Sequence, residues 1–129
     1  MMGWFEKRRS ASILMTILIA IEIFFFSNIP GSIGGTGNVW IPRIYHFTVF
    51  FLFSFFSFMA IRGDKKIKTK YVLIVLIISL IYAALDEIHQ KFVPLRSMSI
   101  TDLLTDSLGV FASVILYIYI SKKTKKKKN

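Results

Sequence analysis

The sequence predicts an all-α protein, a bundle of four transmembrane helices with both termini in the cytoplasm. Hydrophobic residues make up 54% of the 129 residues and the mean hydropathy is +0.60, which is more apolar than a soluble domain of this size. The apolar residues fall into four runs, each close to the roughly 20 residues that cross a bilayer. Connections rich and poor in lysine and arginine alternate along the chain, which is typical of a multi-pass membrane protein.

The four predicted spans follow one another with short connections. They cover, in chain order, residues 11–26, 44–61, 71–88 and 100–120. Pro94 disfavours helix at the residue before it and therefore marks a turn after the third span. We expect one transmembrane domain over residues 1–121, followed by a basic cytoplasmic tail over 122–129.

The distribution of lysine and arginine predicts the orientation in the cell membrane. Residues 1–10 hold three of them, the 62–70 connection five and the tail six, whereas the other two connections hold one and two. The positive-inside rule places the three rich segments in the cytoplasm. The same pattern accounts for the net charge of +10 and argues against a nucleic-acid partner. The absence of cysteine excludes disulfides, thiolate metal sites and a cysteine nucleophile.

Ionisable residues within the predicted spans all fall on one side of the membrane. The first and third spans run outward and the others run inward, so the position of a residue within its span gives its depth. On this basis the ionisable groups lie in the outer halves or at the outer rim. The acids are Glu22, Asp86, Glu87, Asp102 and Asp106, and the other residues are Arg43, His46, His89, Lys91 and Arg96.

Such a cluster requires charge compensation, because an ionised carboxylate at the centre of a bilayer costs about 2.5–3.5 kcal/mol. The acids of the cluster outnumber its lysine and arginine residues, five to three. Protonated carboxyls, charged imidazoles, a divalent cation or a cationic ligand would each balance the excess. The sequence alone leaves these alternatives open.

Helical spacing predicts that two of the spans face each other through polar stripes. Small and polar residues on one helix face are what a transmembrane helix presents to other helices. In the fourth span, Gly109 and Ser113 would permit close approach of two backbones. The stripes are Ser79, Ala83, Asp86, Glu87 and Gln90 in the third span, and Ser99, Asp102, Asp106, Gly109 and Ser113 in the fourth.

Several of these residues also have a purely structural interpretation. Ser99 and Asp102 have the spacing of a helix capping box, with Asp in place of the usual Glu or Gln. An ion pair between Asp86 and Arg96 would fasten the turn between the last two spans. His46 would then serve only as a hydrogen-bonding residue near a helix end.

Three segments resemble the VanZ-like family of small bacterial membrane proteins. "FFFSN" at 24–28 is similar to the aromatic-then-serine end of that family's first helix, and "RIYHFTVF" at 43–50 resembles its basic-x-x-His-Phe block. "LDEIHQKFVPLRSMSITDLLTDSLG" at 85–109 resembles Asp-Glu-x-x-Gln-x-Phe-x-Pro-x-Arg followed by Ser-x-x-Asp. The chain departs from the pattern at Leu95, where glycine is common, and at Asp106, where asparagine is common.

The resemblance implies a cell-envelope protein, and one member of the family is linked to teicoplanin resistance. It implies no agreed reaction, so whether the protein is an enzyme stays open. We expect His46, Asp86 and Glu87 to be the catalytic candidates. The expected binding residues are Arg43, Gln90, Arg96, Ser99, Asp102 and Asp106.

The expected partners are the lipid bilayer and an envelope lipid or cell-wall precursor, held at its anionic group by arginine. No cofactor is required, although a divalent cation on Asp86, Glu87, Asp102 and Asp106 is a variant of this site. The alternative is a structural or partner-binding membrane protein without catalysis. A transporter is disfavoured, because the inner halves of the spans carry no charge.

Overall fold

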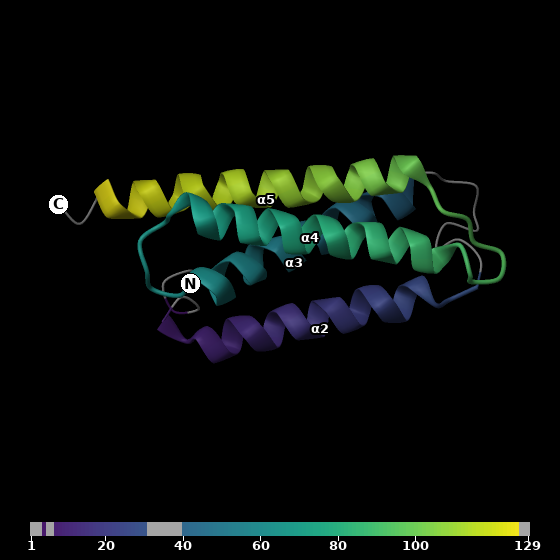
Figure 1. Ribbon diagram of the computed structural model, residues 1–129, viewed down its shortest axis with the longest axis horizontal. Coiled ribbons are helices and arrows are strands. Elements are labelled where there is room, and N and C mark those ends of the chain that lie inside the picture. The colour runs from purple at the N-terminus through teal and green to yellow at the C-terminus, as the bar shows by residue number, and fades with distance from the viewer. Residues whose placement is uncertain (1–3, 5–6, 31–39, 127–129) are drawn as a thin grey trace.

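The computed structural model describes residue 4 and residues 7–30 and 40–126, and it is helical wherever regular structure is described (Figure 1). Each of the four long helices is apolar enough to cross a membrane. This confirms the prediction of an all-helical chain with four spans. The helices are α2 (Arg9–Ser27), α3 (Trp40–Arg62), α4 (Thr69–Gln90) and α5 (Ile100–Lys126).

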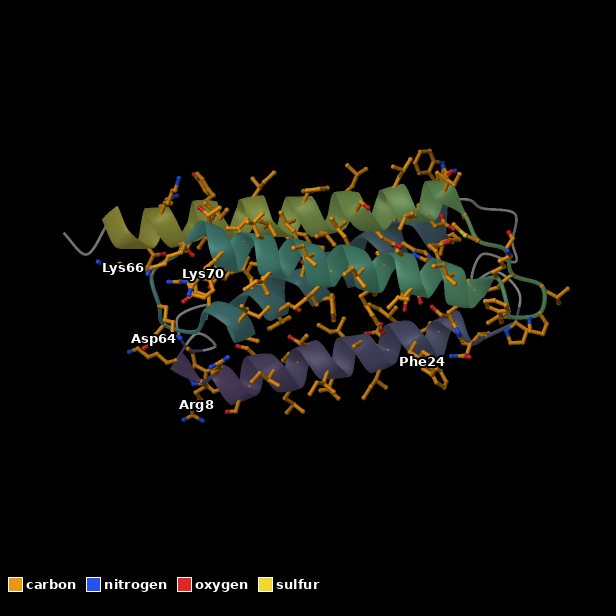
Figure 2. The ribbon with its side chains drawn as sticks, viewed as in Figure 1. Arg8, Phe24, Asp64, Lys66 and Lys70 are labelled. Atoms are coloured by element: carbon orange, nitrogen blue, oxygen red, sulfur yellow. The ribbon has the colours of Figure 1, made fainter. Side chains whose placement is uncertain are left out.

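The helices run alternately in opposite directions, so the bundle has two chemically different ends (Figure 1). Basic residues such as Arg8, Lys66 and Lys70 gather at the end that holds the connection between α3 and α4, whereas Phe24 lies towards the opposite end (Figure 2). The connection between α4 and α5 is at that opposite end, which we call the polar end, and the end with the connection between α3 and α4 is the basic end. The predicted cytoplasmic location of the basic end continues to depend on the positive-inside rule.

Each of the four helices is longer than the span predicted for it. α3 begins at Trp40, before the predicted start at 44, and α5 continues to Lys126, beyond the predicted end at 120. Lysine is a good helix former, so the first part of the basic tail continues the last span as helix. α3 ends at a left-handed cap, because Gly63 has a φ of 60° and its N–H donates to the Met59 carbonyl at 2.9 Å.

The core is built around α3, which packs against the other three helices. One apolar cluster lies nearer the polar end and includes Ile23, Phe50 and Val110. A second cluster lies nearer the basic end, where the rings of Phe58 and Tyr117 stack with centroids 4.2 Å apart. Large apolar side chains elsewhere on the helices are exposed, as expected for faces that contact lipid.

Gly109 sets the distance between α3 and α5. A Cβ atom added at this position would lie 2.4 Å from the Phe47 carbonyl oxygen and 3.1 Å from the Phe51 nitrogen. The close approach predicted at Gly109 is present, but its partner is α3 and not α4, which the polar stripes had predicted to face this part of α5. His46 is adjacent to Phe47, so this contact also fixes the depth and rotation of the histidine.

The connection between α4 and α5 contains a strained residue. Leu95 has a φ of 60°, and its side chain is 86% exposed. The left-handed conformation costs roughly 1–2 kcal/mol for a residue with a Cβ atom, which explains why glycine is common here in the VanZ-like pattern. Because the side chain is exposed, its packing contributes little that would offset this strain.

We expect Leu95→Gly to raise the free energy of unfolding by about 0.5–1 kcal/mol, because relief of strain exceeds the added entropy of the unfolded chain. Thermal unfolding of the purified protein in detergent measures the effect. Leu95→Ala is the matched control, since it removes the same exposed side chain but keeps the Cβ atom. Equal melting temperatures for the two variants would contradict the assignment of strain.

Candidate functional site

Buried polar side chains from all four helices meet at the polar end of the bundle. Each of them is less than 9% exposed, although the surrounding helix faces are apolar. Such burial is expensive unless the groups are bonded, so their partners decide what the site is for. The buried residues are Ser27 from α2, His46 from α3, Asp86, Glu87 and Gln90 from α4, and Asp106 from α5.

Asp86 belongs to a hydrogen-bond network that fastens α2 to α4. Its Oδ1 accepts a hydrogen bond from the Ser27 hydroxyl, and its Oδ2 accepts one from Gln90 Nε2 at 2.9 Å. Both carboxylate oxygens are thus occupied within the protein. Asp86 was predicted as a catalytic residue and Gln90 as a binding residue. In the structure both belong to a network that connects α2 to α4.

Arg96 fastens the same end of α2 from the other side. Its guanidinium donates to the carbonyl oxygens of Phe26 and Ile29, at 3.1 Å each. Phe26 lies in the last turn of α2 and Ile29 lies just beyond it, and the Phe26 carbonyl also accepts a hydrogen bond from the Ile29 N–H at 3.3 Å. Arg96 thus lies at the predicted end of the molecule and holds the terminus of α2; its role in binding stays a prediction.

His46 and Asp106 form a buried pair between α3 and α5. His46 Nδ1 lies 2.9 Å from Asp106 Oδ1, and the two side chains are 6% and 0% exposed. An ionised carboxylate only accepts hydrogen bonds, so the Nδ1–H of a neutral His46 donates, and Nε2 then carries the lone pair. Asp106 Oδ2 is buried and has no hydrogen-bond partner among the described residues.

Glu87 is the most enclosed carboxylate of α4. Its side chain is 0% exposed, and its Oε2 accepts a hydrogen bond from the Ser99 N–H at 2.8 Å. Its Oε1 is buried without a hydrogen-bond partner in the described part of the chain. Glu87 therefore presents one bound and one free oxygen inside the bundle.

Only one of the two hydrogen bonds of the predicted capping box is present at the start of α5. The Asp102 N–H donates to Ser99 Oγ at 3.2 Å, as the motif requires. The Ser99 N–H, however, donates to Glu87 rather than to the Asp102 side chain. No hydrogen bond to the Asp102 carboxylate is found within the described ranges, so that carboxylate remains available while Ser99 caps the helix.

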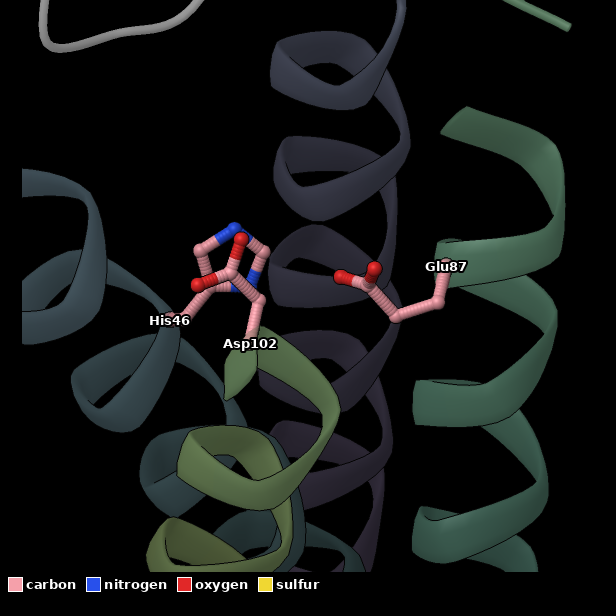
Figure 3. A group of neighbouring side chains, drawn as sticks. All are labelled: His46, Glu87 and Asp102. Atoms are coloured by element: carbon pink, nitrogen blue, oxygen red, sulfur yellow. The ribbon is translucent and has the colours of Figure 1, made fainter. Parts of the chain in front are cut away.

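Three of these side chains converge on a common point. One ligand atom each of His46, Glu87 and Asp102 lies within 4.8 Å of the other two (Figure 3). The three residues come from different helices, α3, α4 and α5. Two carboxylates and an imidazole at this separation provide a proton-transfer site or three ligands for a cation.

The other predicted residues lie around this group. Arg43 is half-buried on α3, with its guanidinium 5.6 Å from the centre of the Trp40 ring. His89 is half-buried, and its Nε2 lies 3.1 Å from Asn28 Oδ1 at the end of α2. Glu22, in contrast, is exposed on α2 and has no hydrogen bond among the described residues.

Tyr45 is a polar residue of this region that sequence reasoning missed. Its hydroxyl is buried and lacks a hydrogen-bond partner in the described part of the chain. It was missed because the aromatic residues of α3 fit a packing role equally well. Its position directly before His46 is the one signal in the sequence that points to the site.

Comparison with known proteins identifies the family of the chain. No curated protein and no solved structure matches the chain. The family model described as VanZ/LLP1 matches residues 5–121, which include every residue of the site described above. Because the match covers most of the chain and the resemblance rests on the residues that meet at the polar end, the protein belongs to the VanZ/LLP1 family.

Proposed function

We propose that this VanZ-like membrane protein binds a component of the cell envelope at the polar end of its bundle, from the outer side of the membrane. The observation that carries the proposal is Glu87, a fully buried carboxylate with one oxygen free, beside His46 and Asp102. A carboxylate that served only to hold helices would be expected to have both oxygens occupied, as Asp86 does.

The ligand class that we favour is a lipid or cell-wall precursor with an anionic group. Arg43 offers a guanidinium at the outer end of α3, and arginine binds phosphate or carboxylate through two parallel hydrogen bonds. Arg96 already donates to two backbone carbonyls, so Arg43 is the stronger candidate of the two for direct contact. Resistance to teicoplanin is the phenotype that the resemblance suggests.

The same group of residues supports proton transfer if the bound component is also modified. His46 would act through Nε2, since Asp106 engages its Nδ1, and Asp106 would orient the ring. Glu87 is the second candidate, with Ser99 holding one of its oxygens. Binding and modification share these residues, so the first experiment addresses the site as a whole.

We expect Glu87→Gln to abolish teicoplanin resistance while the amount of protein in the membrane stays unchanged. The amide keeps the size of the side chain but loses the charge and one acceptor oxygen. The measurement is the minimum inhibitory concentration of teicoplanin in a sensitive bacterial host that expresses the chain. Glu22→Gln is the matched control, because Glu22 is an acid of the same predicted membrane half but is exposed.

Two outcomes would count against the proposal. If the unaltered chain leaves the inhibitory concentration unchanged, the resistance role is wrong. If Glu87→Gln retains full resistance, the site described here does not perform it.

A structural or partner-binding role without catalysis is the second candidate. It is favoured by the Asp86 network and the Arg96 contacts, which tie α2 to α4 and to the connection between α4 and α5. On this interpretation Glu87→Gln would lower thermal stability and protein level together with any phenotype. A normal melting temperature with lost resistance would exclude it.

A further inference from the structure

We propose that His46, Glu87 and Asp102 bind one divalent transition-metal ion, of the class of Zn²⁺ or Mn²⁺, at the polar end of the bundle. One ligand atom from each residue lies within 4.8 Å of the others, and three different helices supply them (Figure 3). Bound zinc would lie roughly 2.0–2.2 Å from each nitrogen or oxygen ligand, so these atoms are close enough to share one ion after small side-chain shifts.

His46 is prepared for metal binding by its partner. Histidine ligands usually donate their second ring N–H to a carboxylate or carbonyl, which fixes the tautomer and the ring orientation. Asp106 Oδ1 lies 2.9 Å from His46 Nδ1 and is fully buried, as this arrangement requires. Asp106 is then a positioning residue, and Nε2 of His46 is the nitrogen that binds the ion.

Glu87 supplies the independent sign of a missing ligand. Its side chain is 0% exposed, and its Oε1 has no hydrogen-bond partner in the described part of the chain. Figure 3 shows its carboxylate directed from α4 towards His46 and Asp102. A buried carboxylate oxygen without a partner is unfavourable, and a cation at this point removes the penalty.

Of the four acids that the sequence suggests as cation ligands, the structure leaves two, Glu87 and Asp102. Both oxygens of Asp86 accept hydrogen bonds from protein donors, which leaves it outside the group. Asp106 acts through His46, as described above. Asp102 remains a ligand, because the hydrogen bond at the start of α5 uses its backbone N–H and leaves its carboxylate free.

The ligand types decide the class of metal. Magnesium and calcium favour sets of six or more oxygen ligands, whereas imidazole suits zinc, and the two carboxylates beside it would also suit manganese. Three protein ligands also leave at least one coordination position open, which is typical of catalytic rather than structural zinc. If the proposed function holds, the anionic group of the envelope component occupies that position, and the ion prevents its repulsion by the acids.

Metal binding is measured on the full chain, purified in detergent and stripped with a chelator. We expect calorimetric titration with Zn²⁺ or Mn²⁺ to show one site per chain. Asp106→Asn removes a supporting residue and should weaken binding by about 10–100-fold. Loss of a direct ligand should weaken binding more than this, in each of the variants His46→Ala, Glu87→Gln and Asp102→Asn. His89→Ala is the matched control, since it removes a histidine from the same end of the bundle without changing the affinity.

Asp102→Asn keeps the proposal testable if a variant of a fully buried residue fails to fold, because Asp102 is only partly buried. An unchanged affinity in Asp102→Asn and Glu87→Gln would overturn the site. Tighter binding of Mg²⁺ or Ca²⁺ than of Zn²⁺ and Mn²⁺ would overturn the metal class. Neither result depends on teicoplanin resistance, so failure of the metal site and failure of the proposed function are distinguishable.

Discussion

Replacing Gly109 with alanine is expected to lower the free energy of unfolding by about 3 kcal/mol, at the upper end of the range for overpacked cores. The added Cβ atom would lie 2.4 Å from the Phe47 carbonyl oxygen and 3.1 Å from the Phe51 nitrogen. Both contacts are with backbone atoms, which cannot rotate away as a side chain can. α3 and α5 must therefore separate, and packing is lost along the seam between them.

The measurement is thermal or denaturant unfolding in detergent micelles, followed by helical circular dichroism. Leu108→Ala is the matched control on the neighbouring residue, because Leu108 is 62% exposed and contributes little to the core. We also expect Gly109→Ala to weaken metal binding, since displacement of α3 moves His46 away from Glu87 and Asp102. Stability equal to that of the unaltered chain would show that the two helices do not depend on this contact.

The contact at Gly109 illustrates how much of the fold the sequence predicts. Apolar runs of membrane-spanning length predicted four helices, and a stripe of small residues predicted close packing at Gly109, although against α4 and not against α3, where it occurs. The ends of the helices were less predictable. α5 continues to Lys126 because lysine sustains a helix even where hydrophobicity has ended.

The site was predicted in position but not in its bonds. The depth of His46, Glu87, Asp102 and Asp106 follows from their place in each span, so their common location was accessible from the sequence. Their partners depend on how each helix is rotated against the next. Spacing along one helix suggested that Asp102 completes the capping box, whereas Glu87 from α4 takes that position.

The bonds divide the buried polar residues into two groups with different expected behaviour. Ser27, Asp86 and Gln90 satisfy one another and connect α2 to α4. His46 and Glu87 each keep one atom that is free to contact a ligand. Substitutions in the first group should therefore affect stability, and substitutions in the second should affect binding.

Asp86→Ala tests this division most directly, and we expect it to lower the free energy of unfolding by about 2–4 kcal/mol. The substitution leaves the Ser27 hydroxyl and the Gln90 amide, which are 4% and 3% exposed as residues, without their acceptor. Each buried donor then lacks a hydrogen bond that the apolar surroundings cannot replace. Asp86→Asn should cost less, because the amide oxygen still accepts one of the two bonds.

Unfolding in detergent, with Asp64→Ala as the exposed control, measures the loss. The double variant Ser27→Ala with Asp86→Ala should be less destabilised than the sum of the single variants, because the two residues share one hydrogen bond. Below its melting temperature, the Asp86→Ala protein should bind Zn²⁺ with the affinity of the unaltered chain. If instead stability is retained and metal binding is lost, Asp86 belongs to the site itself and the division between the two groups is wrong.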